Sequence, residues 1–188
     1  LPSRFADSTV SESQRKFMGT LWNTYAFYIM YAEIDGFDPS KYTLEKDKLP
    51  AMDRWILSRL HSLVAGVDEE MEAYDITGAS RLMQDFVDEL SNWYVRRNRD
   101  RYWGKDMTQD KINAYMTLYT VLEALIRVAA PFVPFVTESI YQNMVRVPFP
   151  DAPISVHLTD FPVSDRRFID EDLESQMDVA QHIVFLGR

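Results

Sequence analysis

The chain has 188 residues, enough for one domain or for one domain with a short extension. Hydrophobic residues make up 46% and charged residues 26%, a composition that excludes a disordered chain and a long uninterrupted membrane span. The net charge is -9, and the absence of cysteine excludes disulfide scaffolds, Cys-ligated metal sites and thiol nucleophiles, and fits a reducing compartment.

Helical periodicity dominates from the start of the chain. The first helix is expected to begin near Ser11 and to end before Gly36, because glycine is a common residue just past a helix end. Pro50 can open a second helix, since proline fits the first turn. Apolar residues then recur every three or four positions as far as Tyr74, which predicts one buried face.

Three further helices are expected in the middle of the chain. The third follows a break at residues 75–77 and is predicted to run to Trp103 as one continuous rod, with Gly104 as its stop. The fourth spans about 108–130 and is apolar on nearly every side, which is typical of a helix in the centre of a bundle. Two prolines then bend the chain into a fifth helix that ends near Val145.

The last forty residues differ from the rest. Residues 148–164 carry four prolines and are expected to form a connector, in which Ser155–Leu158 could pair as a short strand. A final helix is expected from about Asp170. The fold class is therefore all-α: a bundle of four to five long helices over residues 11–147, then a connector and the start of a C-terminal helical region over 148–188. Because the chain opens without an initiator Met and stops on an apolar run, we expect it to be a piece of a longer protein.

Catalytic and cofactor signatures are not found in the sequence. Neither of the common glycine-rich phosphate loops, GxGxxG or GxxxxGK[ST], occurs. His61, His157 and His182 each lack a glutamate three residues earlier, so the di-iron bundle motif is missing. A Ser–His–Asp catalytic triad assembles from distant parts of a chain, so the sequence does not exclude one. The strained turn that usually carries the catalytic serine is, however, not found in the sequence. We therefore expect no catalytic residue, no metal site and no cofactor in this chain.

One segment has a composition unlike the rest of the acidic chain. Between Arg96 and Lys105 five basic residues accompany one acid, and tyrosine and tryptophan are interleaved with them. Guanidinium groups pair with phosphate and aromatic rings stack on bases, so this mixture is typical of a nucleic-acid surface. An overall charge of -9 repels phosphate at long range, which predicts weak and strongly salt-sensitive binding.

A regular α-helix would divide this segment into two faces. Arg97 and Arg101 continue the apolar line of Leu90 and Tyr94, so they could contact RNA, or instead pair with buried carboxylates or with groups of a neighbouring domain. The opposite face is better placed to meet RNA, and it carries Asn92, Arg96, Arg99 and Trp103.

At these residues the sequence becomes similar to a known family. The run from Leu90 to Trp103, LSNWYVRRNRDRYW, resembles the arginine-rich segment of the isoleucyl-tRNA synthetases, which are class Ia aminoacyl-tRNA synthetases. The resemblance covers essentially the whole chain in the expected order. Its other parts are Arg15–Phe17, Thr20–Tyr25, Met52–Leu60, the Pro-Phe corner Ala130–Phe135, and Ser155–Leu158 with Asp160–Pro162.

The resemblance implies an anticodon-binding helical bundle within a cytoplasmic ligase. The parent enzyme would join isoleucine to its tRNA with ATP and Mg²⁺, with zinc as a further candidate. Its ATP-binding HIGH and KMSKS signatures and its editing domain are not in this chain, so the fragment is expected to bind tRNA without ligating it. Residues 1–10 would end the stem that follows the catalytic domain.

The partners implied are the anticodon stem-loop of isoleucine tRNA and the catalytic and C-terminal domains of the same parent chain. Neither DNA nor a membrane is expected as a partner. Asn23 and Lys16 on the first helix are added as candidates from the family's general geometry. The complete candidate tRNA-binding set is Lys16, Asn23, Asn92, Arg96, Arg97, Arg99, Arg101 and Trp103.

Three other interpretations compete. The same domain of a valyl-, leucyl- or methionyl-tRNA synthetase would share the Trp-Asn and Pro-Phe elements, although the Asn-Trp-Tyr-Val-Arg-Arg run favours the isoleucyl enzyme. A helical protein-interaction scaffold would explain the acidic charge more simply but leaves the interleaved arginines and aromatics without a purpose. An intact small enzyme has no catalytic constellation to support it.

Overall fold

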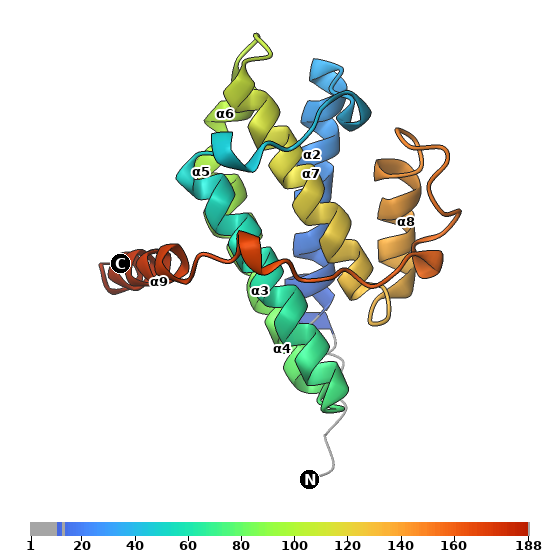
Figure 1. Cartoon of the computed structure of the whole chain (residues 1–188), viewed down its shortest axis with the longest axis vertical. Helices are drawn as coiled ribbons and strands as arrows, with labels where there is room; N and C mark the ends of the chain where they lie inside the picture. Colours follow the sequence, from blue (N-terminus) through green and yellow to red (C-terminus); the bar gives the residue numbers. More distant parts are fainter. Residues whose placement is uncertain (1–10, 13, 188) are drawn as a thin grey trace.

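The computed structural model describes residues 11–12 and 14–187. Every regular element within those residues is helical, and they contain no strand, which confirms the all-α class (Figure 1). The expected stem end at residues 1–10 lies outside the described part of the chain.

The long helices follow the predicted order. A π turn over Arg15–Gly19 leads directly into the first of them, α2. The helices that make up the bundle are α2 (Thr20–Asp35), α3 (Ala51–Glu72), α4 (Ile76–Glu89), α7 (Gln109–Ala129) and α8 (Pro134–Met144).

Local sequence signals place the helix ends where they were expected. Gly36 follows α2 in the left-handed conformation, with φ of 61°, which glycine adopts without steric cost. Pro50 immediately precedes α3. The Thr108 side chain accepts a hydrogen bond from the Lys111 backbone N–H at 3.2 Å and so caps α7. These ends depend on residues within one turn of the helix, which explains why the sequence predicts them.

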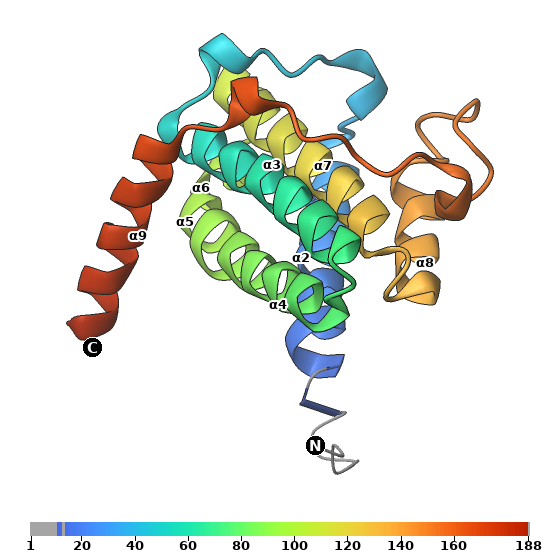
Figure 2. The same ribbon diagram turned by 60° about the horizontal axis from the view of Figure 1, so that its bottom comes forward.

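Helix α7 occupies the centre of the bundle, as its apolar surface predicted. It packs against α2, α3 and α8, and Tyr115, Leu118 and Leu122 are fully buried in it (Figures 1 and 2). Lys111 in its first turn is also buried, and its ammonium pairs with Asp35 at 2.6 Å. A buried lysine is stable only when it is paired, so this contact ties α7 to the end of α2.

The predicted strand at Ser155–Leu158 is wrong. Residues Val156–Leu158 form a 3-10 turn instead, and the Ser155 side chain accepts from the His157 backbone N–H. Glu138 of α8 accepts hydrogen bonds from the Ser155 hydroxyl and from the Val156 N–H, both at 2.9 Å. The backbone donor that a sheet would need is therefore used by a helix carboxylate, and the described residues provide no partner strand.

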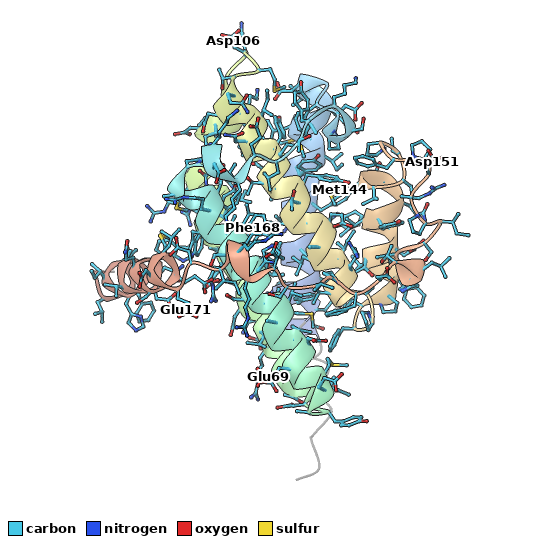
Figure 3. All side chains as sticks on the ribbon, in the orientation of Figure 1. Glu69, Asp106, Met144, Asp151, Phe168 and Glu171 are labelled. Atoms are coloured by element: carbon cyan, nitrogen blue, oxygen red, sulfur yellow. The ribbon has the colours of Figure 1, made fainter. Side chains whose placement is uncertain are left out.

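The connector crosses the bundle and ends in α9 (Glu171–Leu186), the expected C-terminal helix, which lies on the side of the bundle away from α8 (Figures 1 and 2). Figure 3 shows Phe168 and Glu171 where the chain passes over α3 into α9. Glu174 holds the helix there by accepting from Ser58, from Ser62 at 2.9 Å and from Arg59 at 3.2 Å. These polar contacts with α3, together with the packing of Leu173 and Met177 against the core, hold the first half of α9 in place.

Two absences apply to the described residues only. No helix among them combines the length and apolarity that a bilayer crossing requires. Among the same residues, no group of three or more His, Asp or Glu side chains is arranged to hold a metal ion.

Candidate nucleic-acid interface

The predicted rod from residue 77 to residue 103 is helical throughout, because Leu90, Arg96 and Arg99 at its internal junctions all keep right-handed helical backbone angles, but it contains a π turn that was not predicted. Helix α4 passes into a π turn over Leu90–Val95, and two short helices follow, α5 (Arg96–Asn98) and α6 (Asp100–Trp103). A π turn holds one more residue than an α turn, so every later side chain is displaced by one position around the axis.

This displacement changes which residues face the core. In a regular helix the buried line through Leu90 and Tyr94 would continue to Arg97. In the structure it continues to Asn98 and Tyr102, which are 6% and 1% exposed. The π turn therefore turns Arg97 out to the surface, where its guanidinium lies 5.0 Å from the centre of the Trp93 ring.

Arg101 is held by carboxylates. Its two terminal nitrogens contact the two oxygens of Asp53 at 2.6 and 2.8 Å, and its Nε contacts Asp110 at 2.9 Å. Burial alone would lower the pKa of Arg101, but the hydrogen bonds to Asp53 and Asp110 outweigh it and raise that pKa. The alternative expected for Arg101, pairing with a buried carboxylate, is confirmed. A contact between Arg101 and RNA stays a prediction, which this occupied geometry does not favour.

Asp53 is the residue that sequence reasoning missed here. It lies in the first turn of α3, is completely buried, and also accepts a 2.7 Å hydrogen bond from the Tyr94 hydroxyl. Burial is the main reason why the pKa of Tyr94 is raised, so the tyrosine stays a donor. The signal that could have found Asp53 is an acidic residue on the apolar face of a helix, one turn before Ile56 and Leu57.

The remaining arginines form an exposed cationic surface. Arg96, Arg97 and Arg99, called the arginine patch below, are all exposed, and none makes an ion pair with another described residue. They lie on the outer side of a helix whose inner side is fixed by Arg101 and Tyr102. Guanidinium groups pair well with phosphate oxygens, so the arginine patch is a candidate site for phosphate.

Trp103 extends this surface at the end of α6. Its side chain is 60% exposed, and its Nε1 donates to the Tyr31 hydroxyl of α2 at 2.9 Å. The hydrogen bond uses the only donor of the indole and orients the ring, so what Trp103 can offer a ligand is the π face. An exposed, oriented aromatic face is suited to stacking on a base.

Two of the other candidates, Lys16 and Asn92, lie in more acidic surroundings. Lys16 pairs with Glu12 at 2.8 Å and lines a hollow of about 410 Å³ that also holds three carboxylates, one of which, Glu89, is paired with Arg59 at 2.9 Å. Asn92 donates to one of them, Asp88, at 2.7 Å. Asn23 is exposed on α2. The structure therefore brings Lys16 next to carboxylates, which disfavours phosphate at that point. The carboxylates of the hollow are Asp85, Asp88 and Glu89.

Comparison with known proteins gives a consistent result. Residues 53–188 match the sequence profile of the family described as the anticodon-binding domain of tRNA ligase. Over 190 aligned residues the chain is 54% identical to an isoleucine–tRNA ligase of Clostridium novyi and 52% identical to that of Clostridium tetani, with the whole chain covered in both cases. An isoleucine–tRNA ligase of Bacteroides fragilis is 46% identical over 96% of the chain. The chain spans only 16–18% of the length of these relatives.

Proposed function

The chain belongs to the family of tRNA-ligase anticodon-binding domains, in its isoleucine–tRNA ligase branch, and from that premise we propose that the arginine patch grips the anticodon stem-loop of an isoleucine tRNA. The observation that carries the proposal is the patch itself: three exposed guanidiniums without ion-pair partners among the described residues. They are carried by a helix that buried contacts hold in place.

Each candidate residue has a distinct part in this proposal. Arg96, Arg97 and Arg99 bind phosphates, and Trp103 stacks on an unpaired base at the edge of the loop. The amides of Asn92 and Asn23 are suited to reading base edges, because each side chain presents both a donor and an acceptor.

Two candidates are assigned smaller parts. Arg101 acts as the internal support of the patch, since its donors are already used by Asp53 and Asp110. Lys16 contributes little to affinity, because the carboxylates of its hollow offset its charge.

The proposal extends to the parent protein, of which this chain is a part. The parent joins isoleucine to tRNA with ATP and Mg²⁺ in the cytoplasm, with zinc as a further candidate elsewhere in it. Its catalytic and C-terminal domains are the partners of this bundle. Contacts made at the anticodon help to orient the distant acceptor end, so part of their free energy appears in the rate of the whole enzyme.

A titration at low salt tests the proposal. Isoleucine tRNA and a copy with a substituted anticodon are titrated against the 188-residue chain, and we expect the natural anticodon to bind more tightly. Arg96→Ala and Arg99→Ala are expected to weaken binding and to lower the slope of log affinity against log salt by about one per lost phosphate contact.

Arg81→Ala provides the matched control, because Arg81 is an exposed arginine of α4, outside the patch, and its loss changes the net charge equally. If Arg81→Ala lowers the slope as much as Arg96→Ala does, the effect is one of net charge and the patch has no special role. Equal affinity for both tRNAs would remove the claim that the anticodon is read.

A further inference from the structure

A cavity lies between the π turn and the far half of α9. It measures about 390 Å³, within the range of about 300–1,000 Å³ that is typical of small-ligand sites. Trp93 forms the wall on the bundle side, and four residues of α9 form the other: Gln181, His182, Val184 and Phe185. The contacts of Glu174 with α3 fix the position of this second wall.

The chemistry of this cavity differs from that of the other hollows. The hollow beside Lys16 is lined by three carboxylates. A larger hollow at the start of α9 is lined by both signs of charge: the carboxylates of Asp170, Glu171 and Asp172, and the basic side chains of Lys46, Arg54, Arg166 and Arg167. The Trp93 cavity has no carboxylate in its lining. Two aromatic rings, an imidazole and an amide leave its lining without formal negative charge, so the lining does not repel the phosphates that accompany an RNA base.

Two observations favour a nucleobase over a purely apolar ligand. The side-chain amide nitrogen of Gln181 is buried and has no hydrogen-bond partner among the described residues. A buried, unpaired amide costs about 1–3 kcal/mol, which a ligand with a complementary polar edge recovers when the Gln181 side chain turns its covered nitrogen toward the cavity. In addition, Arg97 of the arginine patch packs over the same Trp93 ring, so the cavity adjoins a phosphate-binding group.

We propose that this cavity holds one unstacked base of the anticodon loop, stacked on Trp93 and read at its edge by the Gln181 amide, while Arg97 binds the phosphate beside it. The inference rests on the proposed function, because it assigns one base of the same loop to a particular site. It names α9 as part of the recognition surface. Gln181, His182 and Phe185 belong to neither the arginine patch nor the candidate set drawn from the sequence.

A thermodynamic cycle between base and side chain tests this assignment. Three anticodon stem-loop RNAs, each with an abasic nucleotide at one anticodon position, are titrated against the 188-residue chain alongside the intact stem-loop. One abasic RNA is expected to bind about tenfold more weakly to the unmodified chain, a loss typical of one stacked base. In Trp93→Leu the same base removal is expected to change affinity less than about twofold, because the stacking contact is already gone. In Gln181→Leu, which keeps the ring but loses the edge contact, the loss on base removal is expected to lie between about twofold and tenfold.

Two controls separate binding from folding. Gln176→Leu makes the same substitution at an exposed position of α9 outside the cavity and is expected to retain the tenfold loss. Trp93→Phe keeps an aromatic ring and is expected to restore most of the coupling lost in Trp93→Leu. Because Gln181 lies on an outer helix, Gln181→Leu remains informative even if Trp93→Leu does not fold.

The outcomes distinguish this inference from the function on which it rests. If all three abasic RNAs lose the same affinity in every variant, the base does not enter the cavity, and the inference fails while the arginine patch stands. If the intact stem-loop binds with no dependence on Arg96 and Arg99, both proposals fail.

Discussion

Replacing Asp53 by asparagine tests whether a buried ion pair supports the arginine patch. The carboxylate is completely buried and accepts three hydrogen bonds, two from Arg101 and one from Tyr94. Breaking a buried pair by removing one charge costs about 3–5 kcal/mol. Arg101 would keep its contact with Asp110, which places the expected loss at the lower end, about 3 kcal/mol.

Denaturation by urea, followed by circular dichroism, measures this loss directly. For a chain of this size, about 3 kcal/mol corresponds to a fall in Tm of roughly 6–12 °C. Arg101→Met alone should be similarly harmful, because it leaves the Asp53 carboxylate buried and unpaired. The double variant Asp53→Asn with Arg101→Met should lose less stability than the sum of the two single variants, by at least about 1 kcal/mol.

Asp110→Asn is the control for this experiment. The Asp110 side chain is 57% exposed, and exposed pairs contribute less than about 1 kcal/mol, so this variant should unfold almost like the unmodified chain. An Asp53→Asn variant within 1 kcal/mol of the unmodified chain, or strictly additive losses in the double variant, would refute the reasoning. In either case Asp53 and Arg101 would not act as a pair.

Three further predictions concern other contacts. Burial lowers the pKa of His61 below its usual 6.5; Lys46 lowers it further, and Asp165 partly opposes the shift. The folded state therefore favours the neutral imidazole, which accepts a hydrogen bond from the Asp165 backbone N–H at 3.0 Å. The neutral His61 ring therefore stabilises the fold above pH 6.5, and this contribution is lost as the pH falls through the lower pKa of the folded state. When the pH is lowered from 7.5 to 5.5, the Tm of His61→Asn should fall by less than the Tm of the unmodified chain. Glu174→Ala removes the hydrogen bonds that Glu174 accepts from α3 and should speed amide hydrogen exchange in α9 while exchange in α7 is unchanged. Equal exchange rates in α9 with and without the substitution would show that Glu174 does not anchor this helix. Asp88→Asn removes one negative charge beside Asn92 and should tighten tRNA binding about two- to threefold at low salt, whereas unchanged affinity in the titration would place the RNA away from this hollow.

The arrangement of the candidate site residues was predicted in part. The basic, aromatic composition of residues 96–105 identified the surface, and the exposure of Arg96 and Arg99 is confirmed. Arg97 was predicted to lie on the buried side of the helix, because the prediction assumed a regular α-helical period. The π turn shifts every later side chain by one position around the helix axis, so Arg97 is exposed instead. No local pattern in the residues around Trp93 predicts that π turn. The cavity beside Trp93 was not predicted at all, since its other wall comes from residues about ninety positions later.

The sequence by itself determined the helices and their ends, because caps and apolar periodicity act within a few residues of the position they control, as at Gly36 and Thr108. Only the tertiary structure decided which charges are available to a ligand. Arg101 and Arg99 are two residues apart and chemically identical, yet one is held by a carboxylate 48 positions away and the other is exposed. Pairing of that kind depends on how α3 packs against the arginine-bearing helix, a long-range arrangement that no local pattern in the chain specifies.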